Sequence, residues 1–97
     1  MLRITLEQTG DKLERIVLEG RLAGPWAAEL ERVWIDAVSR GVPEKLTIDL
    51  RDVTYADASG KGVLVRILAE THTEFLTSTL ANQDLAGEIV RAAQIQH

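Results

Sequence analysis

Residues 45–68, KLTIDLRDVTYADASGKGVLVRIL, predict a strand, a short polar corner and a helix that follows directly. In residues 46–50 apolar side chains alternate with polar ones, which is the period of a half-buried strand. Residues 57–60, DASG, are short or small and are favoured where a helix begins. The apolar face of the helix would then consist of Val63, Leu64, Ile67 and Leu68. We therefore expect a strand joined to a helix that begins at Ser59.

Ser59 is the residue of this stretch that we expect to carry a function. In the first turn of a helix its hydroxyl lies near backbone N–H groups that have no partner within the helix. This end of a helix also carries a partial positive charge and is a natural site for a phosphate group. The simpler interpretation is that Ser59 only caps the helix, because capping is the commonest reason for a serine at this position.

A serine hydrolase is disfavoured. Its nucleophile needs a neighbouring base, usually histidine, and the two histidines of the chain are His72, beyond the helix, and His97, the last residue. The glycine of a nucleophile elbow is also missing, because Asp57 stands two residues before Ser59. We therefore do not expect an enzyme of this class.

Residues 60–62, GKG, resemble the end of a phosphate-binding loop but do not complete it. Such a loop requires a glycine where this chain has Tyr55, and a serine or threonine where it has Gly62. We expect instead that the two glycines, Gly60 and Gly62, allow the start of the helix to approach neighbouring backbone closely. No nucleotide cofactor is expected.

Three aspartates lie around the corner, and together they would suit a hard cation such as Mg²⁺. They are Asp49, Asp52 and Asp57. Strand side chains alternate between two faces, so three acids spread along a strand and a loop do not all point one way. Asp57 is better explained as a helix cap or loop acceptor, and no metal site is expected.

The composition is that of one small globular domain in a chain of 97 residues, 45% of them hydrophobic. The absence of cysteine excludes disulfides and thiolate metal sites. A net charge of −4 argues against a nucleic-acid partner. The chain has neither the apolar run of a signal peptide nor the ~20 apolar residues of a membrane span. We therefore expect a cytoplasmic protein with no segment inserted in a membrane.

The N-terminal part of the chain predicts a hairpin and a helix. Residues 2–6 and 13–18 have strand patterns, and residues 8–12 contain the glycine of a turn between them. Pro25 suits the first position of a helix, and Gly41 is placed to end it.

After residue 70 we expect a polar connector at 71–74, a strand at 75–80 and a last helix capped by Asn82 or Asp84. Its buried stripe would consist of Leu85, Ile89, Val90 and Ala93. The whole chain then has the order β-β-α-β-α-β-α, which predicts an α/β fold: a single-layer mixed sheet of about four strands with helices packed against it.

Residues 46–68 resemble the core signature of the STAS domain, the fold of bacterial anti-sigma factor antagonists that also occurs at the C-termini of sulfate transporters. The family pattern is an apolar strand, then Asp-Ser-Ser-Gly-x-Gly, then an apolar helix. Residues 57–62, DASGKG, fall on that motif. The order of the predicted elements extends the resemblance over nearly the whole chain.

The resemblance implies a non-enzymatic regulatory binding module. In antagonists of this family, the second serine of the motif is phosphorylated by a partner kinase that doubles as an anti-sigma factor, and this serine falls on Ser59. The unphosphorylated antagonist binds that kinase and frees the sigma factor. The residues next to the phosphate would be Asp57, Gly60, Lys61 and Gly62, and the partner surface would include Asp49, Asp52 and Tyr55.

The chain departs from the family pattern in three ways. Ala58 replaces the first serine, which leaves Ser59 as the only hydroxyl of the motif. Lys61 stands where the family commonly has an apolar residue, and it would be placed to pair with a phosphate on Ser59. Residues 1–97 are expected to form one STAS-like domain that lacks a C-terminal strand and helix of longer members. An uncovered sheet edge would then favour a homodimer or another partner.

A second function is compatible with the same residues. The chain also resembles the small STAS subunit of bacterial phospholipid-transport ABC systems, a constitutive adaptor that binds an ATPase without needing the serine. Ser59 favours the phosphorylated module, whereas Lys61 and the missing C-terminal part favour the adaptor. In either case the expected partner is a protein, an ATP-binding anti-sigma factor kinase or an ABC ATPase.

Overall fold

The structure is a computed structural model that describes residues 1–10 and 12–95. Residue 11, in the predicted turn, and His97 therefore lie outside the described residues. The observed order is β-β-α-β-α-β-α, as predicted. The strands are β1 (Leu2–Thr9), β2 (Lys12–Leu22), β3 (Lys45–Ala56) and β4 (His72–Leu76), and the helices are α1 (Pro25–Val38), α2 (Ala58–Glu70) and α3 (Leu80–Ile95).

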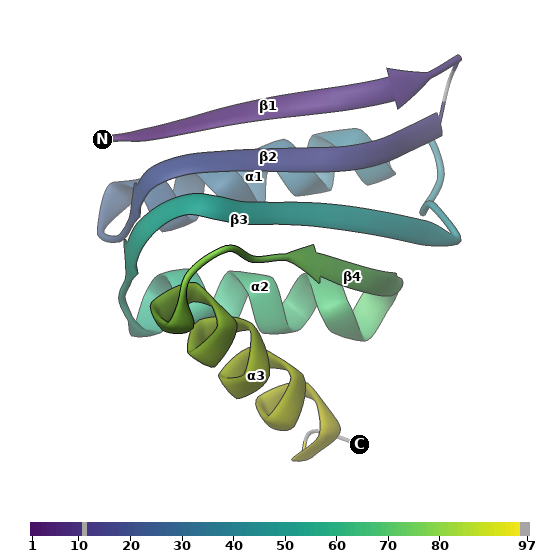
Figure 1. Ribbon diagram of the computed structural model, residues 1–97. Coiled ribbons are helices and arrows are strands. Elements are labelled where there is room, and N and C mark those ends of the chain that lie inside the picture. The colour runs from purple at the N-terminus through teal and green to yellow at the C-terminus, as the bar shows by residue number, and fades with distance from the viewer. Residues whose placement is uncertain (11, 96–97) are drawn as a thin grey trace.

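The four strands form one mixed sheet in the order β1-β2-β3-β4. β1 pairs with β2 antiparallel, while β3 is parallel to both β2 and β4. In Figure 1, α1 and α2 lie behind the sheet, and α3 lies beyond β4, against α2 and the last part of β3. The mixed sheet with packed helices, predicted from the sequence, is confirmed. None of the described helices is both long and apolar enough to cross a membrane.

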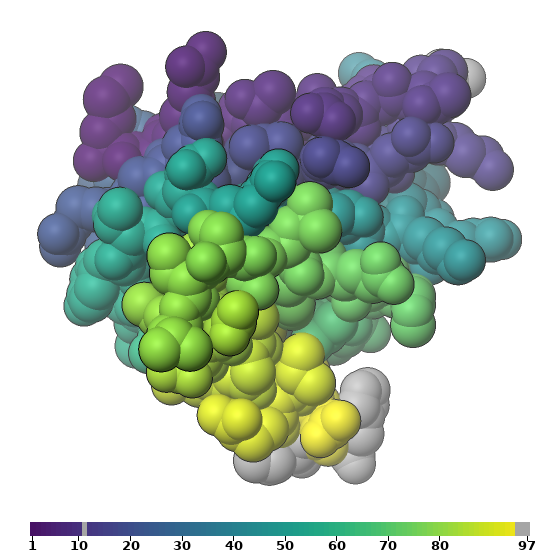
Figure 2. Space-filling model, in the orientation of Figure 1, coloured from purple at the N-terminus to yellow at the C-terminus, as the bar shows by residue number. Residues whose placement is uncertain are grey.

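The sheet has one face covered by helices and one open face. The covered face carries the apolar side chains that the strand periodicity predicted, such as Ile16 opposite Ile48, both fully buried. The core between this face and the helices also contains Leu18, Leu30 and Trp34. The open face carries the alternate residues of each strand, and most of them are polar or charged. Figure 2 shows this face toward the viewer.

Trp34 joins two helices at the back of the sheet. Its indole is fully buried, and Nε1 donates a hydrogen bond of 2.7 Å to Oε2 of Glu70 at the end of α2. A buried indole N–H needs such a partner, because an unpaired donor inside the protein is costly. The contact therefore fixes the end of α2 against α1.

β3 is longer than the predicted strand at residues 46–50. The pairing with β2 shifts between Val17 and Glu19, and again between Gly20 and Arg21, which inserts an extra residue into β3 at each place. Each bulge puts two neighbouring exposed residues on β3, and burial after Leu50 no longer alternates. The period of two therefore ends at Leu50, although the strand continues to Ala56.

β4 begins earlier than predicted, at His72 instead of residue 75. The polar residues 72–74 pair with β3 in parallel, beginning with Lys45 opposite His72. The strand then ends at Leu76, so the prediction of a strand through residue 80 is wrong. The backbone that follows turns into the start of α3, where Thr79 accepts a hydrogen bond from the N–H of Asn82.

The start of α3 is a reciprocal cap. Oγ1 of Thr79 accepts from the backbone N–H of Asn82 at 3.1 Å, and Oδ1 of Asn82 accepts from the N–H groups of Ser78 and Thr79. The cap residue is thus Thr79, and neither Asn82 nor Asp84 occupies that position. The predicted buried stripe is correct for Ile89 and Ala93, partly so for Leu85, and wrong for Val90, which is exposed.

Candidate functional site

The candidate site lies where the parallel strands β2 and β3 end and the chain enters α1 and α2. Asp57 is the residue that organises this corner. Its Oδ1 accepts a hydrogen bond of 2.8 Å from the N–H of Gly60, and its Oδ2 accepts one of 2.9 Å from the N–H of Gly24. Its own N–H donates to the carbonyl oxygen of Leu22. The carboxylate therefore caps α2 and ties its first turn to the loop before α1.

These hydrogen bonds hold the pKa of the Asp57 carboxyl below its usual value, first through the N–H of Gly24 and then through that of Gly60. Both N–H groups bond to the ionised form and so favour it. Because the pKa is lower in the folded state, the contribution of Asp57 to stability is present above its unfolded pKa of about 4. It is lost as the pH falls through the folded value.

We predict that Asp57→Asn lowers the melting temperature at pH 7 and lowers it much less at acidic pH, where Asp57 itself is protonated. The amide retains one acceptor oxygen but cannot serve both N–H groups as a charged carboxylate does. Thermal unfolding followed by circular dichroism between about pH 3 and pH 7 measures this. An equal loss at every pH would contradict the role given to the charge. Asp36→Asn, at an exposed acid of α1, is the control.

Gly60 and Gly62 differ in their surroundings. A Cβ on Gly60 would lie 2.3 Å from the carbonyl oxygen of Leu22, so the predicted close approach of backbone is correct for Gly60. A Cβ on Gly62 would meet no atom within 4 Å, so the same prediction is wrong for Gly62. The helix start is thus held against the end of β2 at one glycine only.

Ser59 is exposed in the first turn of α2, one residue beyond the start at Ala58. The capping interaction is made by Asp57, so the interpretation of Ser59 as the cap is wrong. Among the described residues, no protein group is hydrogen-bonded to the Ser59 hydroxyl. The fold therefore leaves this hydroxyl accessible beside the first N–H groups of a helix.

Ser59 lines a depression between α1 and α2 with a volume of about 390 Å³. We call this depression the Ser59 groove. The other residues that line it are Gly24, Ala27, Ala28, Glu31, Gly62, Val63 and Arg66. Its charged members form an ion pair between the helices, in which Nη1 of Arg66 lies 2.5 Å from Oε2 of Glu31.

Arg66 and Glu31 were not among the predicted site residues. Arg66 lies seven residues after Ser59, which is two helical turns and therefore the same side of α2. The spacing was thus visible in the sequence, but the approach of Glu31 depends on the packing of α1 against α2. The cation that lines the Ser59 groove is consequently Arg66 and not the predicted Lys61.

Lys61 and Tyr55 line a second groove, between the end of β3 and α3, with a volume of about 290 Å³. Nζ of Lys61 lies 2.8 Å from Oε2 of Glu88 on α3, and the hydrogen bond to this carboxylate raises the pKa of Lys61. The Lys61 side chain thus extends toward α3 and away from the Ser59 groove. Tyr55 is about half exposed, and the guanidinium of Arg21 lies 4.8 Å from the centre of its ring.

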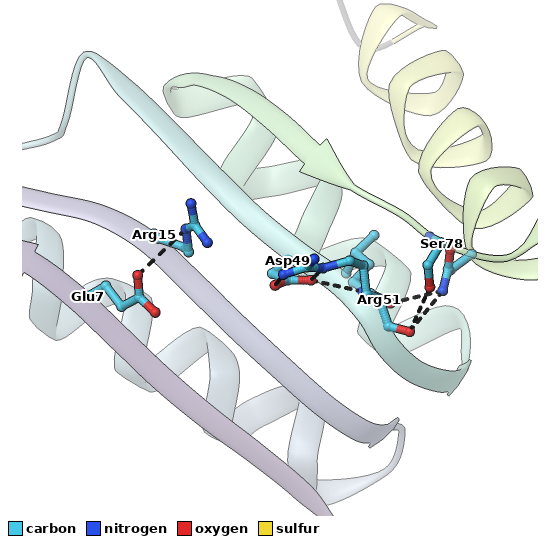
Figure 3. Close-up of polar contacts among 7 residues, drawn as sticks. Glu7, Arg15, Asp49, Arg51 and Ser78 are labelled. Atoms are coloured by element: carbon cyan, nitrogen blue, oxygen red, sulfur yellow. Dashed lines mark hydrogen bonds and ion pairs between the residues drawn. The ribbon is translucent and has the colours of Figure 1, made fainter.

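Asp49 and Asp52 both lie on the open face of the sheet, but only Asp52 is exposed. Asp49 has 5% of its surface exposed, and its carboxylate accepts hydrogen bonds of 3.0 and 2.7 Å from Nε and Nη2 of Arg51, as Figure 3 shows. The Arg51 guanidinium holds the pKa of Asp49 below its usual range. Asp49 therefore has a structural partner within the strand, which leaves Asp52 and Tyr55 as the accessible members of the predicted partner surface.

Among residues 1–10 and 12–95, no cluster of histidine, aspartate and glutamate side chains has an arrangement that could hold a metal ion. Asp57 is committed to two backbone N–H groups and Asp49 to Arg51, as described above. Asp49 and Asp57 are thus each bound to partners of their own.

No protein-family model matches the chain, and no curated protein sequence matches it either. Several solved structures, however, are similar to the chain. The anti-sigma factor antagonist SpoIIAA in its unphosphorylated form has a TM-score of 0.66 at 17% identity, covering 86% of this chain and 80% of SpoIIAA. An anti-sigma factor antagonist from Mycobacterium paratuberculosis has a TM-score of 0.66 at 18% identity, covering 97% of this chain and 95% of the antagonist.

A third similar structure is an uncharacterised protein with a SpoIIAA-like fold from Shewanella loihica. It has a TM-score of 0.60 at 12% identity, covering 92% of this chain and 76% of that protein. At these identities the likeness concerns the fold. The chain therefore has the SpoIIAA-like fold of anti-sigma factor antagonists, which confirms the STAS-like fold expected from its sequence.

Proposed function

Since the chain has the fold of anti-sigma factor antagonists, we propose that it is a regulatory binding module whose docking to a protein partner is switched off by phosphorylation of Ser59. The partner would be an ATP-binding kinase that also acts as an anti-sigma factor. The observation that supports this proposal is that Ser59 is exposed in the first turn of α2, whereas Asp57 makes the hydrogen bonds that the corner needs.

The surroundings of Ser59 suit a phosphate group. In the proposed reaction the Ser59 oxygen attacks the γ-phosphorus of ATP, the hydroxyl proton is released, and ADP leaves. The product carries about 1.5 to 2 negative charges at the start of a helix, where the N–H groups and the helix dipole favour an anion. Arg66 lines the same groove and supplies a cation, although it is paired with Glu31 in the unphosphorylated chain.

The same charges would oppose docking. Apart from Ser59 and the ion pair of Glu31 and Arg66, the Ser59 groove is lined by small and apolar residues, and a partner that covers this groove removes water from it. A phosphate that becomes desolvated against such a surface, or that faces an acidic partner group, weakens the complex. We place Asp52 and Tyr55 at the margin of the proposed partner surface because both are exposed.

The proposal predicts that the chain gains a single phosphate and that Ser59→Ala gains none. The protein is incubated with ATP, Mg²⁺ and each anti-sigma factor kinase of its source cell, and its intact mass is measured. Ser39→Ala is the matched control, because Ser39 is exposed at the far end of α1. Phosphate on the Ser59→Ala variant, or none on the wild type with any of these kinases, would refute the switch and leave a constitutive adaptor as the function.

The variants must also retain the fold for this test to be informative. Ser59 is exposed and its hydroxyl is not used by a neighbouring group, so Ser59→Ala should change the free energy of unfolding by no more than about 0.5 kcal/mol. Ser59→Asp places an acid in the first turn of α2 and should stabilise the helix by about 0.3–1 kcal/mol. Urea unfolding measures both. A large decrease in the free energy of unfolding of either variant would mean that the fold depends on the Ser59 side chain.

A further inference from the structure

The outer edge of β1 is the feature that the proposed function leaves unexplained. β1 is the first strand in the order of the sheet and pairs only with β2. In Figure 1, no other strand of the sheet lies outside it. The strand has eight residues, and the register shift near its end inserts the extra residue into β2, so β1 itself is continuous. An exposed edge of this length is a template for another strand.

The backbone groups on this edge can be assigned from the pairing with β2. The N–H of Arg21 donates to the carbonyl oxygen of Met1, next to the paired residues Leu2 and Gly20. In an antiparallel ladder, residues directed toward the neighbour alternate with residues directed away from it. The odd-numbered residues of β1 therefore bond to β2, and the N–H and C=O groups of Leu2, Ile4 and Leu6 point outward.

We propose that β1 pairs antiparallel with β1 of a second copy of this chain, around a two-fold axis at Thr5. In this register Ile4 of one copy lies opposite Leu6 of the other, and both use the outward groups just identified. Thr5 lies opposite Thr5, and Arg3 lies opposite Glu7 of the second copy, twice by symmetry. The interface is isologous, and the two sheets of four strands become one continuous sheet.

The charges on the open face select this register. Nε of Arg3 lies 3.7 Å from Oε2 of Glu19 on β2. Nε of Arg15 on β2 lies 3.6 Å from Oε1 of Glu7, and Figure 3 shows this pair. Joining the copies places Glu19, Arg3, and then Glu7 and Arg15 of the second copy in one row. The charges in this row alternate in sign across four strands. Its two central residues, Arg3 and Glu7 of the second copy, form a non-hydrogen-bonded cross-strand pair, and side chains approach each other most closely in pairs of this kind.

Other registers also allow the outward N–H and C=O groups of the two β1 strands to pair, but they do not place Arg3 opposite Glu7. A shift of two residues in either direction places Arg3 opposite a threonine. A shift of four places Arg3 opposite Arg3, or Glu7 opposite Glu7, and like charges directly opposite each other are destabilising. On the covered face, the half-buried side chains of Ile4 and Leu6 would gain apolar contact with each other across the interface.

The test uses charge reversal and mixing, and it does not depend on phosphorylation. Sedimentation velocity of the wild type should show a dimer at concentrations up to about 1 mM. Arg3→Glu and Glu7→Arg should each weaken that dimer at least about tenfold, because each opposes like charges twice. An equimolar mixture of the two variants should recover dimers, because both contacts across the heterodimer are then between opposite charges. Arg40→Glu, an exposed reversal remote from β1, should dimerise like the wild type.

A cysteine at the two-fold axis tests the geometry independently. The chain contains no cysteine, so Thr5→Cys introduces a single thiol, and mild oxidation should convert this variant to a covalent dimer. Ala28→Cys, exposed on α1, should cross-link far less. A wild type that is strictly monomeric at about 1 mM, a dimer insensitive to both reversals, or a mixture that does not recover would each overturn the proposal. A monomer that binds an extended peptide along β1 would show that the edge serves another protein.

Discussion

Gly60→Ala should lower the free energy of unfolding by about 3 kcal/mol or more, a large part of the ~5–15 kcal/mol that holds a typical domain folded. The new Cβ would lie 2.3 Å from the backbone oxygen of Leu22 and 2.7 Å from Cγ of that residue. Both Gly60 and Leu22 are buried, and the oxygen belongs to β2, so it cannot move aside as a flexible side chain would. The same oxygen accepts the N–H of Asp57, so a displacement would also loosen the cap of α2.

The matched control is Gly62→Ala, two residues further along the same helix. A Cβ there meets no atom within 4 Å, and alanine is favoured over glycine inside a helix. This variant should therefore gain about 0.5–1 kcal/mol. Urea unfolding of the two variants and the wild type measures the contrast. Equal stabilities for the two variants would show that α2 does not approach β2 as described.

Asn82→Ala should lower the free energy of unfolding by about 3 kcal/mol. Asn82 is buried at 3% exposure, and its Nδ2 donates to the carbonyl oxygens of Leu50 at 3.1 Å and Arg51 at 3.3 Å. Because β4 pairs with β3 only as far as Asp49, this side chain takes over as the partner of β3 where β4 ends. The substitution removes the Nδ2 donor from both oxygens, of which that of Arg51 keeps a hydrogen bond from the Ser78 hydroxyl, and it leaves the N–H groups of Ser78 and Thr79 without their side-chain acceptor.

Asn82→Asp distinguishes the acceptor role of this side chain at the start of α3 from its donor role toward β3. A carboxylate keeps the acceptor for the start of α3 but has no donor for the oxygens of Leu50 and Arg51. The variant should be as unstable as Asn82→Ala at pH 7 and should recover at low pH, when the introduced carboxyl is protonated and can donate. Thermal unfolding at several pH values measures this, with Gln83→Ala at the exposed neighbour as the control. A wild-type melting temperature for Asn82→Ala would contradict the role described.

The order of the elements could be predicted because each leaves a local pattern in the sequence. The alternation in residues 2–6 and the proline at the start of the first helix are such patterns, and both are borne out. The end of β3 could not be placed, because two bulges replace the period of two with pairs of exposed residues. The start of β4 was missed because polar residues 72–74 form a strand only through their pairing with β3.

In the candidate site, too, local features could be predicted and contacts between distant elements could not. Asp57 could be assigned as a cap because an aspartate before a helix start is a local signal, and it caps α2 as expected. The direction of Lys61 could not be predicted, since its partner Glu88 lies on a helix distant in sequence. The approach of Glu31 to Arg66 likewise depends on the packing of α1 against α2. What the sequence indicates of the site is thus the local cap and the spacing along α2, whereas the partners of Lys61 and Arg66 depend on how the helices pack.

The affinity of the partner for the two forms of this chain tests the central claim most directly. The protein is prepared unmodified and with phosphoserine at position 59, both forms are checked for equal melting temperatures, and each is titrated into the kinase by calorimetry. We expect the phosphate to weaken binding by at least about a hundredfold, equivalent to some 3 kcal/mol, with no loss of stability. Equal affinities for the two forms would contradict the account.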